Sequence, residues 1–239
     1  MDANELATAK ASLLEYLNIN FIEKQRADGL LEKLKSINAI GHTMELWFED
    51  MLHHFAAELT FNHNRLFYTA HNWQNLPLIA FGARNMLELN VWIAYCAKSI
   101  GHAKQFYDDK FRDGIAFMNA LKRLLHSANH LQSDLLISEG IKTINELANS
   151  VGAEAPDADY TKVVQAASEL GVREYFISLN TILSKFAHPT SMVVLNYLTK
   201  EYEGSLEGIA TFFKLVGIDH EIAGWKLICA TIEARGVKV

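Results

Sequence analysis

The sequence predicts an all-α protein, a bundle of about eight to ten helices around a buried helix near residues 76–100. Apolar residues recur at helical spacing along nearly the whole chain, and neither strict alternation nor an Asn-Gly or Asp-Gly hairpin signal is present. The 239 residues include only 3 prolines and 13 glycines, too few for a turn-rich all-β chain. We therefore expect a single all-helical domain over residues 1–239, with residues 1–40 as an alternative N-terminal arm or dimerisation element.

Four helices are predicted in the first hundred residues. Asp2 and Glu5 have the spacing of a capping box, which predicts a helix that runs to about residue 17. The apolar spacing predicts two further helices over about residues 21–37 and 43–59. Pro77 suits the first turn of the fourth helix, where its missing N–H leaves no hydrogen bond unmade. This fourth helix is apolar on almost every side, so we expect it at the centre of the bundle.

The remaining helices are predicted from the same periodicity and from the signals at their ends. Residues 152–159 combine glycine, alanine, aspartate and proline, and they form the clearest predicted loop. Pro189 ends the helix before it, because a proline pushes the preceding residue out of the helical region. The predicted ranges are about 102–130, 133–150, 161–170, 172–187, 205–216 and 219–234.

Composition excludes several classes of protein. A net charge of −6 and a pI near 5.9 argue against a broad basic surface for duplex nucleic acid, although they leave room for a small basic pocket. No uninterrupted apolar run reaches about 18 residues, so no membrane span is expected, and the N-terminus does not have the pattern of a signal peptide. Cys96 and Cys229 stand among apolar helical residues, so we expect buried thiols and a reducing, cytoplasmic location.

Two charges interrupt the apolar helix over residues 76–100. Arg84 and Glu88 are four residues apart, so they share one face of the helix. A charge among apolar neighbours is costly unless it is paired and hydrogen-bonded. One interpretation is a local salt bridge where the helix reaches the surface. The other is that both side chains face a polar cleft between helices, where they orient a ligand or another side chain.

The helix over residues 172–187 carries polar side chains opposite its apolar stripe. His188 follows at its C-terminal end, where the helix dipole favours a protonated imidazole. A histidine in such a place either caps the helix or serves as a general acid or base. We take Arg84, Glu88 and His188 as candidate catalytic residues, and we assign ligand binding to three neighbours of the histidine on its helix: Thr181, Ser184 and Lys185.

The pair Arg84 and Glu88 on a buried helix, followed about a hundred residues later by the segment 183–189 that ends in His-Pro, resembles the HEPN-like helical bundles. The resemblance is to an uncharacterised bacterial branch of this superfamily, and it covers about residues 40–200. Many HEPN proteins are metal-independent ribonucleases that work as dimers. The resemblance therefore implies a homodimer in which an arginine stabilises phosphate charge and a histidine moves a proton.

The helix end departs from the ribonuclease motif, which places an arginine a few residues before the histidine. Residues 181–184 contain none, and Lys185 stands too close to His188 to replace it. We therefore expect a noncatalytic binding or interaction module without a cofactor, whose partners are a nucleotide or RNA phosphate, or a partner protein, and not a membrane. A metal-independent ribonuclease that uses His188 is the first alternative.

A metal-dependent bundle enzyme is the second alternative. His126 and His130 are four residues apart, a spacing that can hold a metal, and Asp134, His53 or His54 could supply a third ligand. This pattern is similar to the DinB-type helical metal proteins. Lysine and arginine beside the pair favour a solvated helix face instead, so we assign no metal site.

Overall fold

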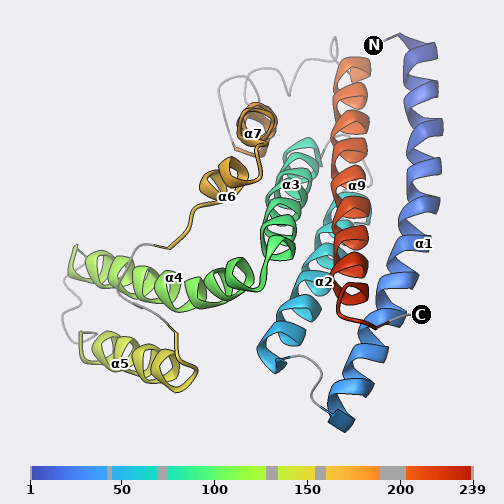
Figure 1. Cartoon of the computed structure of the whole chain (residues 1–239). Coiled ribbons are helices and arrows are strands. Elements are labelled where there is room, and N and C mark those ends of the chain that lie inside the picture. Colours follow the sequence, from blue (N-terminus) through green and yellow to red (C-terminus); the bar gives the residue numbers. More distant parts are fainter. Residues whose placement is uncertain are drawn as a thin grey trace. The chain divides into compact units, whose positions relative to one another are not determined.

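The computed structural model of the chain describes residues 2–41, 45–68, 75–127, 134–153, 160–188 and 203–237 (Figure 1). Within these ranges it contains eight α-helices and no strand, which confirms the predicted all-α fold. The chain divides into two compact units, Met1–Ala97 with Val163–Val239, and Lys98–Lys162. That residues 1–239 behave as one domain stays a prediction.

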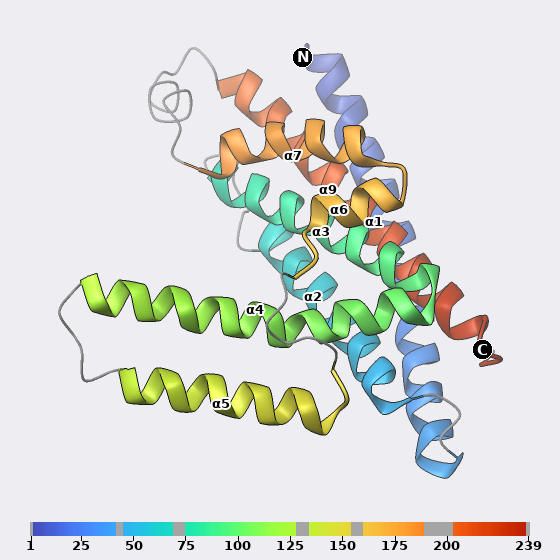
Figure 2. The same ribbon diagram turned by 60° about the vertical axis from the view of Figure 1, so that its left-hand side comes forward.

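The first unit holds six of the helices. Helices α1 and α9 run side by side, and α2 packs against α9 as well (Figures 1 and 2). The short helix α6 packs against α7. Their bounds are α1 (Ala3–Gly41), α2 (Leu46–Phe67), α3 (Leu76–Lys98), α6 (Val163–Glu169), α7 (Arg173–Ala187) and α9 (Glu203–Glu233).

Helix α3 lies at the centre of this unit, as the sequence predicted. Ile79, Tyr95 and Cys96 are at most 4% exposed, and they project from different sides of the helix. Their burial on several sides means that any polar side chain of α3 needs a partner or a route to solvent.

Helix α1 is one continuous helix where the sequence predicted two. The sequence predicted one helix that runs to about residue 17 and a second over about residues 21–37. Asn20, between those two ranges, keeps the helical backbone, and its Nδ2 donates to Glu221 Oε1 on α9 at 3.0 Å. Ala27, Leu30 and Leu34 of α1 are fully buried, so this helix is part of the bundle core. Its role in dimerisation stays a prediction.

Helix α9 also joins two predicted helices. Gly217 lies between the two predicted ranges, and a Cβ there would lie 2.5 Å from Leu66 Cδ1 on α2. Gly217 therefore permits a close approach of two helices and does not end one.

The second unit is built from helices α4 (Ile100–Ser127) and α5 (Asp134–Ser150), which pack against each other. Asp109 on α4 pairs with Arg112 Nη1 at 2.7 Å and accepts the backbone N–H of Thr161 at 3.0 Å. The bond from Thr161 ties the end of this unit back onto α4.

Two predictions about compartment can be compared with the structure. Cys96 and Cys229 are both buried thiols, as expected, and burial raises the pKa of the Cys229 thiol to about 11. Among the described helices, none has both the length and the apolar character that crossing a bilayer requires.

A buried carboxylate joins three helices of the first unit. Glu221 on α9 is 1% exposed, and its oxygens accept hydrogen bonds from Asn20 Nδ2 and from Trp225 Nε1, at 3.0 and 3.2 Å. His63 Nδ1 on α2 lies 2.8 Å from Glu221 Oε2. A buried charge is tolerated when its oxygens are satisfied in this way, so the network fixes the register of α1 and α2 against α9.

We expect Glu221→Ala to lower the free energy of unfolding by about 3 kcal/mol, because it leaves buried donors unpaired. Urea unfolding followed by circular dichroism measures this loss. Glu207→Gln is the matched control on the same helix. Glu207 pairs with Lys10 of α1 across an exposed surface, so its loss should cost less than about 1 kcal/mol. Equal losses in the two variants would contradict a structural role for the Glu221 network.

Candidate functional site

A cluster of polar side chains is built around Arg84 on α3. Arg84 Nε and Nη2 each lie 3.0 Å from Glu88 Oε1, and Nε lies 2.9 Å from Asn180 Oδ1 on α7. Arg84 Nη1 lies 3.4 Å from His188 Nε2. The structure therefore brings Arg84, Glu88 and His188 together from two helices, and it adds Asn180. Their catalytic role stays a prediction.

The end of helix α7 places His188. The helix ends at Ala187, and His188 takes an extended backbone conformation (φ −110°, ψ 153°) while its N–H bonds to the carbonyl of Ser184 at 3.3 Å. An extended residue is expected directly before a proline; Pro189 itself lies outside the described residues. His188 is exposed, so the imidazole stands where the cluster meets solvent.

The cluster is half-buried. The side chains of Arg84 and Glu88 keep 27% and 28% of their surface exposed. The apolar neighbours of Arg84 along α3 suggested deeper burial, but its guanidinium reaches toward the exposed C-terminal end of α7. Solvent, and any solute in it, can therefore reach the guanidinium.

Arg84 keeps capacity to bind an anion. A guanidinium has five N–H donors. Nε–H is shared between Glu88 and Asn180, one Nη2–H faces Glu88, and one Nη1–H faces the lone pair of His188 Nε2. Two donors remain without a partner among the described residues. Because Glu88 and Asn180 hold the group in place, those two donors have a fixed direction.

The three predicted ligand-binding residues lie along α7 before His188. Thr181 and Lys185 are exposed, and Ser184 is half-buried. Lys185 is one turn before His188, so its ammonium can add positive charge to the same end of the helix. The binding role of these three residues stays a prediction.

Asn180 is the residue that reasoning from sequence missed. Its neighbours Phe176, Leu179 and Leu183 form the buried stripe of α7. An amide at a position of that stripe is the signal that could have identified it, because a polar group on a core-facing side needs a partner.

A second polar group involves His220 on α9, which is 7% exposed. Asn90 Nδ2 on α3 donates to His220 Nδ1 at 3.1 Å, and His220 Nε2 lies 3.3 Å from the hydroxyl of Tyr175 on α7. Burial lowers the pKa of His220 from its usual 6.5, and neighbouring Asp219 opposes this effect. Burial also raises the pKa of Tyr175. The group links α3, α7 and α9 through a neutral imidazole.

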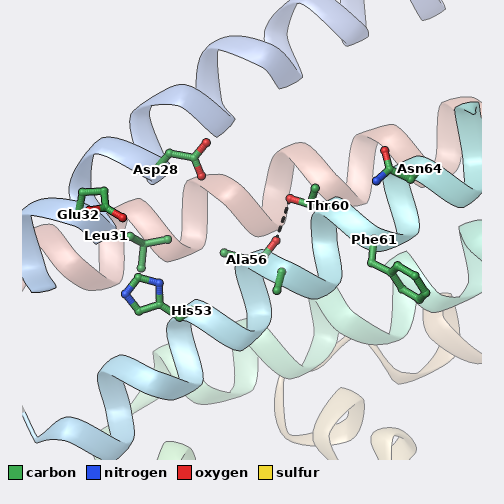
Figure 3. A pocket seen from close by; sticks show the side chains of 9 residues that line it. Asp28, Leu31, Glu32, His53, Ala56, Thr60, Phe61 and Asn64 are labelled. Atoms are coloured by element: carbon green, nitrogen blue, oxygen red, sulfur yellow. Dashed lines mark hydrogen bonds between the residues drawn. The ribbon is translucent and has the colours of Figure 1, made fainter.

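A groove of about 500 Å³ lies between α1 and α2, away from the Arg84 cluster (Figure 3). Figure 3 shows Asp28 and Glu32 on α1 above His53 on α2. Its lining residues come from α1 and α2 alone. The two carboxylates repel a phosphate, so this groove does not fit the ligand expected from the sequence.

The histidines proposed for a metal site are placed only in part. His126 Nε2 lies 2.7 and 2.8 Å from the two carboxylate oxygens of Asp134, and both side chains are about two-fifths exposed. His130 lies outside the described residues. No group of three or more metal-binding side chains occurs in the described ranges.

The fold and the cluster define a class, an all-helical protein with a half-buried Arg/Glu/Asn/His site. Residues 82–206, just over half of the chain, match DUF5677, a family of unknown function, and the chain belongs to this family. The matched segment contains Arg84, Glu88, Asn180 and His188. No curated protein and no solved structure matches the chain.

The neutral, buried His220 predicts a pH dependence of stability. Its folded pKa lies below 6.5, so the unfolded chain binds a proton at a higher pH than the folded chain does. The stabilisation is complete above pH 6.5 and is lost as the pH falls below that value. We expect the urea midpoint of the parent protein to fall more between about pH 7.5 and about pH 5.5 than that of His220→Gln. His54→Gln, at an exposed position of α2, should behave like the parent. The same pH response in all three proteins would contradict this role of His220.

Proposed function

We propose that this chain is a noncatalytic helical binding module, of the HEPN-like kind, whose Arg84 cluster binds the phosphate group of a nucleotide or RNA. One observation carries the proposal: Arg84 is held by Glu88 and Asn180, has two unpartnered N–H donors among the described residues, and stands beside the exposed His188. A pre-oriented guanidinium loses little conformational entropy when it binds an anion.

The geometry suits phosphate in particular. The planar guanidinium offers parallel N–H donors that match two oxygens of a phosphate. Glu88 fixes the fork but also reduces its net charge, so the site needs further positive groups. Lys185 supplies that charge from the end of α7. The Nδ1–H of a neutral His188, whose Nε2 accepts from Arg84 Nη1, is a further donor. The hydroxyl groups of Thr181 and Ser184 are further donors on that helix.

The proposal extends to the setting in which the module works. We place it in the cytoplasm, where thiols such as Cys96 and Cys229 stay reduced. We further propose that it pairs as a homodimer or holds a partner protein. Exposed apolar side chains on α1 offer a surface for this, among them Leu14, Phe21 and Ile22.

A metal-independent ribonuclease is the second candidate function, and the contact between Arg84 Nη1 and His188 Nε2 favours it. In that case His188 would take the proton of a ribose 2′-hydroxyl while Arg84 stabilised the charge on phosphate. Incubation of the protein with single-stranded RNA separates the two functions. Intact RNA supports the binding module, and cleavage that disappears in His188→Ala supports the nuclease.

Titration calorimetry with ribose 5-phosphate tests the phosphate site. We expect saturable binding that weakens about tenfold in Arg84→Gln and several-fold in His188→Ala, because each change removes a group that faces the anion. His188 is exposed, so its replacement should leave the fold intact, which circular dichroism verifies.

Arg173→Gln is the matched control for this titration. Arg173 belongs to the same unit and pairs with Glu174 at the other end of α7, where its side chain is 52% exposed. This variant should bind as the parent does. Equal weakening in Arg173→Gln and Arg84→Gln would show a general charge effect and would overturn the proposed site, as would the absence of binding in the parent.

A further inference from the structure

A cation between two exposed aromatic rings lies next to the Arg84 cluster. Arg65 Cζ on α2 is 4.1 Å from the centroid of the Phe61 ring and 5.3 Å from that of Phe81 on α3. Phe61 and Phe81 are 50% and 36% exposed. Two large rings in contact with water are costly for a folded protein, and together they form a patch that can bind a ring-bearing molecule.

The patch and the Arg84 cluster share one face of α3. Phe81, Arg84, Asn85 and Glu88 occupy positions i, i+3, i+4 and i+7, which line a single stripe. Asn85 Nδ2 donates to Asn62 Oδ1 on α2 at 3.1 Å, and this bond holds the α2 side of the stripe in place. A molecule bound at Arg84 therefore has the Phe81 ring one helical turn away.

We propose that Phe81, with Arg65 and Phe61 beside it, forms a stacking surface for a nucleobase whose phosphate binds at Arg84. This inference rests on the proposed function and names its ligand class, a nucleoside 5′-phosphate unit, either free or within RNA. Bases stack on phenylalanine rings and on arginine planes, and one such contact changes affinity by about tenfold or more.

The charges of the patch suit this ligand. Arg65 of α2 adds a cation beside Phe81, and a cation attracts both the electron-rich face of a base and the phosphate that follows it. The groove between α1 and α2 adjoins the patch through Phe61, but Asp28 and Glu32 line it, so its charge does not suit the phosphate. Single-stranded or mononucleotide ligands fit better than a duplex, since stacking requires an unpaired base.

Calorimetric titration with AMP and with ribose 5-phosphate tests the stacking surface. We expect the parent protein to bind AMP about tenfold more tightly than ribose 5-phosphate. Phe81→Leu should remove this preference and leave the affinity for ribose 5-phosphate unchanged. Arg65→Lys keeps the charge but loses the planar group, so it should remove part of the preference. Phe117→Leu, at a ring that is 65% exposed on α4 in the other unit, should keep all of it.

The outcomes separate this inference from the proposed function. Equal affinities for AMP and ribose 5-phosphate in the parent would overturn the stacking surface and leave the phosphate site standing. A loss of both affinities in Phe81→Leu, with an unchanged melting curve, would also overturn it, because the ring would then act on phosphate binding. AMP binding that depends on Phe81 but survives Arg84→Gln would support the surface and contradict the phosphate site.

A single-stranded oligoadenylate distinguishes the two sources of the ligand. Tighter binding of the oligonucleotide than of AMP, with both weakened in Phe81→Leu, identifies RNA. Equal binding of the two, again weakened in Phe81→Leu, identifies the free nucleotide. Binding of both that is insensitive to Phe81→Leu overturns the inference.

Discussion

The structure of the first unit depends on how the central helix satisfies its polar side chains. Most of α3 is enclosed by apolar neighbours, and a guanidinium in that setting is costly without partners. Arg84 finds Glu88 on its own helix and Asn180 on α7, and Asn85 finds Asn62 on α2. Each of these hydrogen bonds forms only when its donor and acceptor are correctly placed. They therefore specify which face of α7 and which face of α2 pack against α3.

Buried polar contacts also determine how the long helices α1 and α9 are positioned against each other. An unpaired charge on Glu221 would destabilise the fold. Its contacts with Asn20, His63 and Trp225 satisfy the carboxylate and hold α1 and α2 in one position against α9. Apolar packing supplies most of the free energy of folding, but it tolerates sliding of one helix past another. The hydrogen bonds of Arg84, Asn85 and Glu221 prevent this sliding. A rigid scaffold is what a binding site needs if its donors are to point in a fixed direction.

The fold class and the ends of several helices could be predicted from the sequence because they follow from local spacing. Arg84 and Glu88 meet because they are four residues apart, and His188 caps α7 because a proline follows it. The continuity of α1 and α9 could not be predicted in this way. Asn20 and Gly217 have the local signature of helix breaks, and only their neighbours on other helices show that one is a hydrogen-bond donor and the other a point of close approach.

The site was predictable in the same limited sense. Its charged members stood out because they interrupt an apolar helix, whereas Asn180 is a neutral amide in a stripe that otherwise predicts packing. The contact of Arg65 with Phe81 joins α2 and α3, and no spacing within either helix reveals it. Residues whose role depends only on tertiary contacts therefore cannot be identified from the periodicity of the sequence.

The central claim is that a phosphate meets the guanidinium of Arg84. The most direct measurement is a nitrogen–proton NMR correlation spectrum of the arginine side chains, with the Arg84 Nε–H signal assigned by its absence in Arg84→Lys. Addition of ribose 5-phosphate should shift this signal saturably and leave that of Arg173 in place. Saturable binding that leaves the Arg84 signal unmoved would contradict the claim.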